Sequence, residues 1–277
     1  MCHISPTGEP SGHFLHSRMF PLLHLPRWIA ESLPVCVDEN FLDDVTYSSI
    51  CGYYYTRLID NFMDADIDVR NQNGGLLPVT GILVSEFQFI YQAYFPPQHE
   101  FWDRFRTNWR QAAESAGHDA ALTRVDEEEF QRISSRKFCA AAIPVTATCY
   151  YCRHPEVVEA WDEVVRDLGR WSQMFDDLLD WHQDKAQGRA TWFLTEAEER
   201  RGRDRSLAHW VIHSGGPWAF DLLRHWTDDL RELATRVGSP GLEKFLHDRE
   251  ALMAEKERDW KRGFAELDRL AEILQAT

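Results

Sequence analysis

The stretch FDDLLDWHQD, residues 175–184, places four aspartates among large apolar side chains. Asp176, Asp180 and Asp184 follow one another at intervals of four, so they share a face of the helix that we expect over residues 155–186. Like charges at this spacing repel each other by about 0.2–0.5 kcal/mol per pair. The C-terminal half of a helix also disfavours anions. A segment with these penalties needs a compensating cation.

The same construction occurs a second time, in YYYTRLIDNFMDAD, residues 53–66. Asp60 and Asp64 are again four apart, at the end of a largely apolar helix, and Arg57 stands one turn before them. Two such helices facing each other would form a cleft lined by carboxylates. Hard oxygen ligands on two walls suit Mg²⁺, which usually bridges to a substrate phosphate. A solvated acidic face explains one such helix well, but the repetition favours the cleft.

Composition narrows the class of protein. The chain has 277 residues and a formal net charge of −15, and no long basic tract suggests a nucleic-acid partner. No window approaches the roughly 18 uninterrupted apolar residues of a membrane span. Six cysteines without a secretion signal predict reduced thiols. We therefore expect a cytoplasmic protein that does not span a membrane.

Helical periodicity dominates the chain and no set of strands is evident, so the predicted fold class is all-α. We expect a loose tail over residues 1–14, rich in glycine, proline and serine, and one helical domain over residues 15–277. Helices are expected at about 40–64, 79–95, 98–115, 119–135, 136–152 with a bend near Pro144, 155–186, 205–213, 217–237 and 240–275.

Three segments resemble class I isoprenoid synthases. DNFMD, residues 60–64, is similar to their first aspartate-rich motif, DDxxD, with Asn61 in place of the second aspartate. QMFDDLLDWHQDKAQGR, residues 173–189, resembles the second motif of trans-prenyl diphosphate synthases. SSRKF resembles the segment that carries their diphosphate-binding lysine, and Lys137 precedes Asp176 by 176 − 137 = 39 positions. In another register, the aspartates at 176, 180 and 184 take the places of the NDxxSxxxE triad of terpene cyclases.

The resemblance implies a helical bundle with a central cavity, in which three Mg²⁺ ions bind an allylic diphosphate and promote its ionisation. The implied metal ligands are Asp60, Asn61, Asp64, Asp176, Asp180 and Asp184, and Asp60, Asp64, Asp176 and Asp180 are the implied catalytic residues. The implied diphosphate-binding cations are Lys137, Arg189, Lys185, Arg70 and Arg57. The implied substrate pocket includes Tyr55, Gln173 and Phe175, and bulk near Tyr55 suggests short C10–C15 chains.

Departures from the family pattern bear on the reaction. No lysine precedes Lys137, and the segment DVRNQNGG that follows the first motif contains a single arginine, Arg70, so a binding site for isopentenyl diphosphate lacks much of its usual cationic set. This favours a terpene synthase. Three alternatives stay open: a chain-elongating prenyltransferase, a squalene or phytoene synthase whose RxxDxxxD motif would be Arg57, Asp60 and Asp64, and a non-catalytic subunit. The C-terminal Arg-Tyr pair of many bacterial cyclases is absent. Relatives are commonly dimeric, which allows a homodimer, but no sequence pattern marks its face.

Two other motifs raise different chemistries. Cys149 and Cys152 form a single CxxC, which without a second pair is more typical of packing than of a zinc or redox site. His118-Asp119 and His247-Asp248 suggest the helical HD phosphohydrolases, but Gly117 before the first pair is more typical of a helix cap.

Overall fold

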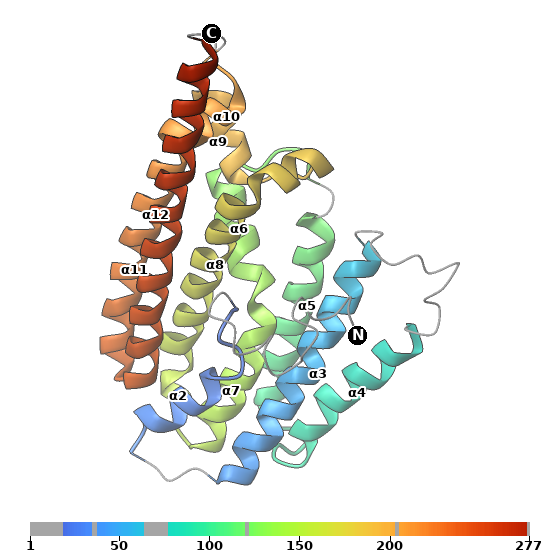
Figure 1. Cartoon of the computed structure of the whole chain (residues 1–277). Coiled ribbons are helices and arrows are strands. Elements are labelled where there is room, and N and C mark those ends of the chain that lie inside the picture. Colours follow the sequence, from blue (N-terminus) through green and yellow to red (C-terminus); the bar gives the residue numbers. More distant parts are fainter. Residues whose placement is uncertain (1–18, 35–37, 64–76, 120–121, 203–204, 276–277) are drawn as a thin grey trace.

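The computed structural model describes residues 19–34, 38–63, 77–119, 122–202 and 205–275. All regular structure in these ranges is helical, as the sequence predicts, and no strand occurs within them. The expected tail at residues 1–14 lies outside the described residues. The helices pack side by side in a bundle (Figure 1). They are α2 (Leu25–Ser32), α3 (Glu39–Met63), α4 (Leu77–Gln92), α5 (Phe101–Asp119), α6 (Glu127–Lys137), α7 (Ala142–Tyr151), α8 (Val158–Gln187), α9 (Trp192–Arg200), α10 (Leu207–Trp210), α11 (Gly216–Val237) and α12 (Pro240–Gln275), with short turns at Cys139–Ala141, Pro155–Val157 and Val211–Gly215.

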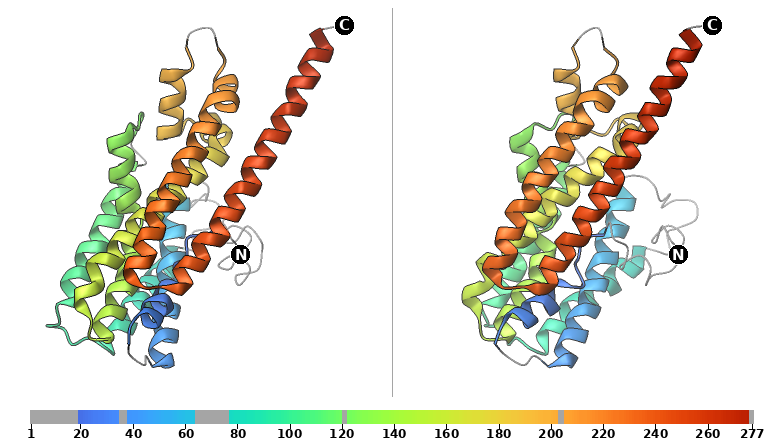
Figure 2. Two further views of the ribbon diagram at one scale, coloured as in Figure 1. Left: turned by 90° about the vertical axis from the view of Figure 1, so that its left-hand side faces the viewer. Right: turned by 60° about the vertical axis from the view of Figure 1, so that its left-hand side comes forward.

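The long C-terminal helices begin and end close to the predicted positions. Gly188 caps the C-terminal end of α8 and Gly238 that of α11, and both glycines adopt the left-handed conformation, with φ of 70° and 66°. Helix α12 begins at Pro240, where proline has no helical hydrogen bond to lose. Figure 2 shows α12 beginning beside the C-terminal end of α11 and diverging from it toward the end of the chain.

Helix α7 joins the two halves of the core. Every residue from Ala142 to Cys149 is buried, because this segment is apolar on all sides. Ile143 and Ala147 belong to the core cluster of α3, α4 and α5, whereas Val145 and Cys149 point into the cluster around α8. Helices α3 and α8 therefore pack on opposite faces of α7. They run in the same direction, so both of their C-terminal ends, which carry the aspartates, point toward one end of the bundle (Figure 1).

The helix predicted over 136–152 is interrupted at Phe138 rather than bent at Pro144. Helix α6 ends at Lys137, and a 3-10 turn precedes α7. Pro144 lies in the first turn of α7. Backbone N–H groups in the first turn have no intrahelical acceptor, so the proline there removes no helical hydrogen bond. The Phe138 ring stacks on Phe20, with 4.6 Å between ring centroids, and lies against Gly169 of α8.

Gly169 allows this close contact between α8 and Phe138. An added Cβ would lie 2.6 Å from Cδ2 of Phe138, a distance that packed side chains do not tolerate. We expect Gly169→Ala to lower the free energy of unfolding by about 1–3 kcal/mol, because overpacking outweighs the better helix propensity of alanine. Urea unfolding would measure this. Gly263→Ala is the matched control, since its Cβ would meet nothing within 4 Å, and it should be neutral or stabilising.

Other predicted boundaries were wrong. Helix α5 continues through Gly117 to Asp119, so Gly117 does not cap a helix, and α6 starts only at Glu127. Asp126 caps α6 by accepting a hydrogen bond of 2.9 Å from the backbone N–H of Glu129. The sequence prediction also omitted α2 and α9. Proline in the first turn of α2 and the side-chain cap of α9 by Thr191 are the local signals for these two helices.

Candidate functional site

Helix α8 has the apolar stripe that the sequence predicts, but its four central aspartates have different environments. Asp176 and Asp180 are exposed, Asp184 is half-buried, and Asp177 is only 4% exposed. The stripe residues Val158, Trp161, Val165, Leu168, Trp171 and Phe175 are each at most 3% exposed. The sequence analysis predicted that the exposed and half-buried carboxylates are metal ligands, and it predicted no role for Asp177.

Asp177 is the buried carboxyl of the site. Gln173 Nε2 donates a hydrogen bond of 2.7 Å to its Oδ1. Burial raises the pKa of Asp177 to about 8, against lowering effects from the Gln173 hydrogen bond and from the charge of Lys137. The charges of Asp184 and Asp176 raise the pKa further. At neutral pH this carboxyl is therefore largely protonated. The i, i+4 pair of Gln173 and Asp177 is the sequence signal that could have identified it.

Lys137 and Arg189 are the predicted cations that the structure brings to this cluster. Lys137 is the last residue of α6, which packs along α8, and its charge lowers the pKa values of Asp177 and Asp184. Arg189, just beyond the end of α8, also lowers the pKa of Asp184. Burial and the charge of Asp180 act in the opposite direction, and the net pKa of Asp184 is raised. Two carboxyls and two cations thus interact at the C-terminal half of α8.

The buried carboxyl makes stability depend on pH. In the unfolded chain Asp177 ionises near 3.8, and in the folded protein near 8. The folded state therefore binds this proton more tightly than the unfolded chain does. The proton's contribution to the free energy of unfolding is complete below pH 3.8 and is lost as pH rises through about 8. Asp177→Asn keeps the hydrogen bond from Gln173 but does not titrate. We therefore expect its free energy of unfolding, relative to that of wild type, to be higher at about pH 8 than at about pH 5.

Urea unfolding of metal-free wild type and Asp177→Asn at these two pH values would measure the gain. An equal stability difference at both pH values would show that Asp177 is ionised in the folded state.

The first aspartate-rich motif is described only in part. Asp60 is half-buried, and Asn61 is 6% exposed near the end of α3. Tyr53 lies one turn before Arg57 and two turns before Asp60, and the charges of both act on it, but its pKa is raised chiefly by burial. Asp64 and Arg70 lie outside the described residues, so their predicted roles stay predictions.

The other predicted site residues lie in varied surroundings. Lys185 pairs with Glu198 of α9 at 2.9 Å, so its ammonium is engaged away from the α8 aspartates. Arg57 is exposed. In the predicted pocket, Tyr55 is half-buried with its ring 5.4 Å from that of Trp109, and Phe175 is packed in the core.

Arg249 of α12 is a residue of this region that the sequence prediction missed. It is 3% exposed, and the charge of Asp176 acts on it. Its guanidinium lies 5.3 Å from the ring centre of Trp171 and 4.9 Å from that of Phe245, and Nη2 donates to the carbonyl oxygen of Met19. Burial lowers the pKa of Arg249 to about 10, so it stays charged at neutral pH. No pattern around position 249 in the sequence distinguishes this arginine from the surface cations of α12.

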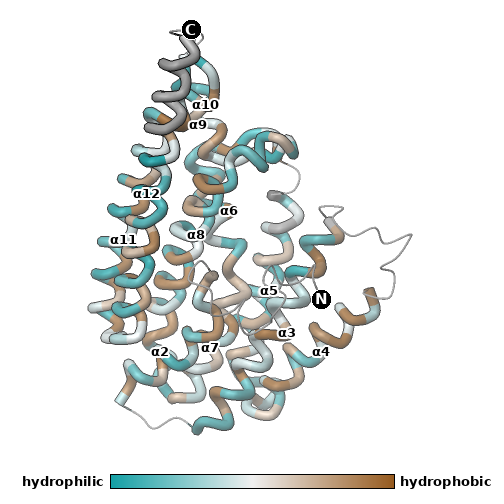
Figure 3. Tube along the Cα trace, viewed as in Figure 1, coloured by the Kyte–Doolittle hydropathy of each residue, from teal (hydrophilic) through white to brown (hydrophobic). Residues whose placement is uncertain are grey.

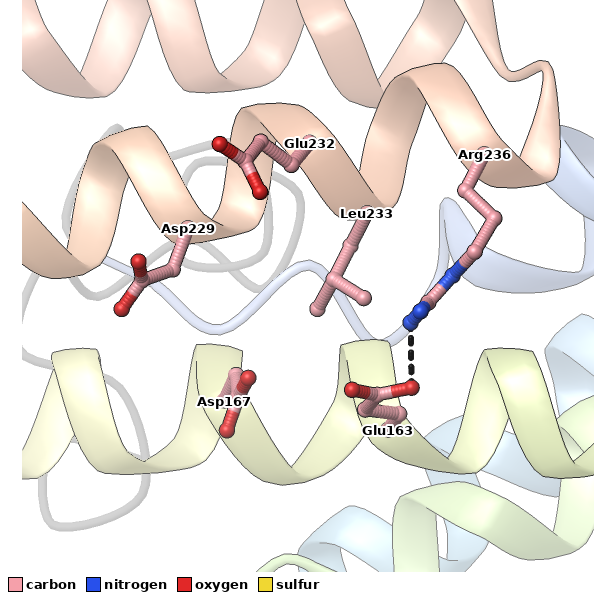
Figure 4. Close-up of a pocket in the computed structure, with 6 residues that line it drawn as sticks. All are labelled: Glu163, Asp167, Asp229, Glu232, Leu233 and Arg236. Atoms are coloured by element: carbon pink, nitrogen blue, oxygen red, sulfur yellow. Dashed lines mark hydrogen bonds and ion pairs between the residues drawn. The ribbon is translucent and has the colours of Figure 1, made fainter.

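An acidic groove lies elsewhere, on the outer side of the bundle between α8 and α11. It has a volume of about 400 Å³ and a single apolar lining residue, Leu233. Figure 4 shows Glu163 paired with Arg236 across it, and Asp167 and Asp229 lie nearby. An isoprenoid chain needs an apolar lining, so this polar groove does not suit such a substrate.

The two other sequence motifs form contacts typical of structure. Cys149 and Cys152 are buried free thiols, and burial raises the pKa of Cys152 to about 11, which disfavours the reactive thiolate. His118 interacts with Glu129 at 2.7 Å, and Asp248 with Lys244 at 2.8 Å, both on the surface. These contacts account for the residues without invoking a phosphohydrolase site.

The donor chemistry of the site fits Mg²⁺ that arrives with a phosphate ligand. Within the described ranges, no group of three or more His, Cys, Asp or Glu residues is close enough to hold a metal together. Mg²⁺ does not require such a cage, because it is usually bound by one or two carboxylates together with water and substrate phosphates. Asp176 and Asp180 present exposed carboxylates for this purpose.

No family model matches the chain, and no curated protein matches it significantly. Among the described helices, none combines the length and the apolar character needed to cross a bilayer.

Proposed function

We propose that this protein is a Mg²⁺-dependent class I terpene synthase of the isoprenoid synthase fold. Its substrate would be an allylic diphosphate of C10–C15 length, which is ionised and then cyclised or converted by elimination. The observation that carries the proposal is the cluster of Lys137, Arg189 and the α8 aspartates, at the end of the bundle toward which the C-terminal end of α3, with Asp60, also points.

The chain's own residues have separable roles in this proposal. Asp176, Asp180 and Asp184 on one side and Asp60, Asn61 and Asp64 on the other would hold the metal ions. When bound, Mg²⁺ neutralises the diphosphate leaving group. Lys137 and Arg189 add fixed positive charge where negative charge develops on the departing diphosphate. Of the α8 carboxyls, Asp184 is half-buried and Asp177 is buried, which limits water on that side of the charge.

The proton on Asp177 also favours an anionic ligand. A neutral carboxyl at this position makes the α8 cluster one charge less negative than its composition suggests. A diphosphate beside four ionised aspartates would meet stronger repulsion. Asp177 thus supports the site without being a metal ligand.

The proposal favours one substrate over two. A chain-elongating enzyme binds a second diphosphate, and the lack of any lysine before Lys137 leaves few cations for it. Arg57 is exposed at the C-terminal part of α3, and Lys185 is engaged with Glu198.

Diphosphate release from C10, C15 and C20 allylic diphosphates tests the function. Each substrate would be assayed with Mg²⁺ or with excess chelator, and with or without isopentenyl diphosphate, and products resolved by mass. We expect Mg²⁺-dependent release and a hydrocarbon or alcohol from one allylic substrate alone. Longer diphosphates formed only with isopentenyl diphosphate would instead identify an elongating prenyltransferase, and a head-to-head product a squalene or phytoene synthase. No release from any substrate would overturn the proposal in favour of a non-catalytic subunit.

A further inference from the structure

Helix α12 carries a charged side chain on the face that packs against the bundle. Over residues 240–264, the part of α12 whose side chains are described, the buried residues are Leu242, Leu246, Arg249 and Met253, each at most 3% exposed. Figure 3 shows hydrophobic and hydrophilic residues alternating along α12, which is typical of a helix with one buried face. Arg249 is the one charged residue among these four. A buried charge usually needs an ion pair or a full set of hydrogen bonds, because its removal from water is costly.

The hydrogen bonds of Arg249 are incomplete. Nη2 donates to the carbonyl oxygen of Met19, but the buried Nε and Nη1 atoms have no acceptor among the described residues. Buried donors without an acceptor are rare in native proteins, and they lower stability. An apolar side chain such as the methionine at position 253 would avoid this cost. The stability of the fold therefore does not account for an arginine at this position.

The guanidinium of Arg249 is fixed in place by two aromatic rings. Its Cζ lies 5.3 Å from the ring centre of Trp171 on α8 and 4.9 Å from that of Phe245 on α12. Trp171 is fixed in turn, because its Nε1 donates to the carbonyl oxygen of Leu223 at 3.2 Å and to Thr227 Oγ1 at 3.0 Å. Arg249 therefore presents a positive charge at a set place beside α8.

Asp176 is the carboxyl on which this charge acts. It follows Trp171 by five residues on α8, a rise of about 7.5 Å, so a guanidinium over the Trp171 ring is within electrostatic reach of its carboxylate. Asp177 is turned by about 100° around the same helix, and the charge of Lys137 on α6 acts on it. The adjacent aspartates of α8 thus have different cations, one from α6 and one from α12.

We propose that Arg249 is a positioning residue, whose buried charge holds the carboxylate of Asp176 in place at the edge of the α8 cluster. Asp176 is exposed and has the same charge as Asp180 one turn later, so repulsion alone would leave its side chain without a preferred direction. A fixed cation on the side of α12 supplies that direction, as groups behind a metal ligand commonly do. The inference rests on the proposed function, in which Asp176 helps to hold the metal ions.

A double-mutant cycle on unfolding tests the link without metal or substrate. The urea midpoint of the full chain would be measured at neutral pH and low salt for wild type, Asp176→Asn, Arg249→Met and the double variant. In wild type, Asp176→Asn leaves the buried guanidinium without its carboxylate and should lower the midpoint. In the Arg249→Met background the same substitution should leave the midpoint unchanged or raise it, because it then removes only the repulsion from Asp180.

The control background removes an arginine of a different helix. Arg231 of α11 is 41% exposed and pairs with Asp228 at 3.4 Å. In Arg231→Met, Asp176→Asn should lower the urea midpoint as much as it does in wild type. Arg249→Gln, which can still donate to the carbonyl oxygen of Met19, removes the buried charge by a second route and should give the same cycle as Arg249→Met.

Turnover distinguishes positioning from packing. Arg249→Met should lower kcat for Mg²⁺-dependent release of diphosphate by about 10- to 100-fold, the usual loss when a group behind a metal ligand is removed. It should cause no further loss in Asp176→Asn, because it acts through that carboxylate. Arg249→Lys, which keeps the charge, should recover part of the activity.

Two results would overturn the inference. The first is an equal shift of the urea midpoint by Asp176→Asn in wild type and in Arg249→Met, since the arginine would then not act on this carboxylate. The second is a coupled cycle together with wild-type turnover in Arg249→Met, which would assign the pair to packing alone. Absence of release by wild type would instead refute the proposed function, and the cycle would still decide whether Arg249 holds Asp176.

Discussion

Asp180→Asn should lower Mg²⁺-dependent release of diphosphate by about 100- to 1,000-fold, while leaving the fold intact. Asp180 is exposed on α8, so removing its charge leaves no buried group without a partner. If its carboxylate helps to hold the metal ions, its loss removes stabilisation of the leaving group that appears only as the C–O bond breaks. The fall should therefore appear in kcat more than in KM, and Asp60→Asn on the opposite wall should behave in the same way.

The control for Asp180→Asn removes the same charge from the same helix. Glu159 stands in the first turn of α8, far from the aspartates, with a side chain that is 75% exposed and paired with Arg104. Glu159→Gln should retain wild-type turnover. Wild-type turnover in Asp180→Asn as well, with an unchanged circular dichroism spectrum, would exclude this aspartate from the metal site.

Lys137→Met should be the second most damaging substitution, lowering kcat/KM by about 100-fold. Lys137 is the cation whose charge reaches both Asp177 and Asp184, so its loss removes a fixed positive charge from the place proposed for the diphosphate. The same loss should raise the pKa of Asp177 further, because the charge of Lys137 lowers it. This second effect can be measured without substrate, from the pH dependence of unfolding. Lys137→Arg, which keeps the charge, should restore much of both properties.

Lys185→Met separates the role of Lys137 from a general effect of positive charge. Both lysines were predicted from the sequence to bind the diphosphate. In the structure, however, Lys185 pairs with Glu198, and its side chain is 53% exposed. We expect Lys185→Met to cost less than about tenfold in kcat/KM, because the pair it breaks is a surface ion pair. Equal losses in the two variants would contradict the distinction that the structure makes between them.

The existence of the long helices was predicted from local signals, whereas the short helices α2 and α9 and several helix boundaries were not. The apolar stripe of α8, the glycine after α11 and the proline that begins α12 are all local features, and each was identified from the sequence. The end of α6 was missed because it depends on Phe138 packing against Gly169 and Phe20, two contacts that are distant in the sequence. Helix α5 passes through Gly117, where the prediction had placed a helix cap.

The sequence by itself determined that the protein is all-helical and that carboxylates gather at the C-terminal ends of two helices, because spacing along a helix depends on backbone geometry alone. Tertiary structure decided which carboxyl is buried. Asp176 and Asp177 are neighbours about 100° apart around the helix axis, and Asp177 is the one that the packing of α8 buries, where the charge of Lys137 on the neighbouring α6 acts on it. Tertiary structure likewise brought Arg249 from the far end of the chain toward Asp176 and left the outer face of α4 exposed. Burial and charge contacts of this kind depend on neighbouring elements that no local pattern records.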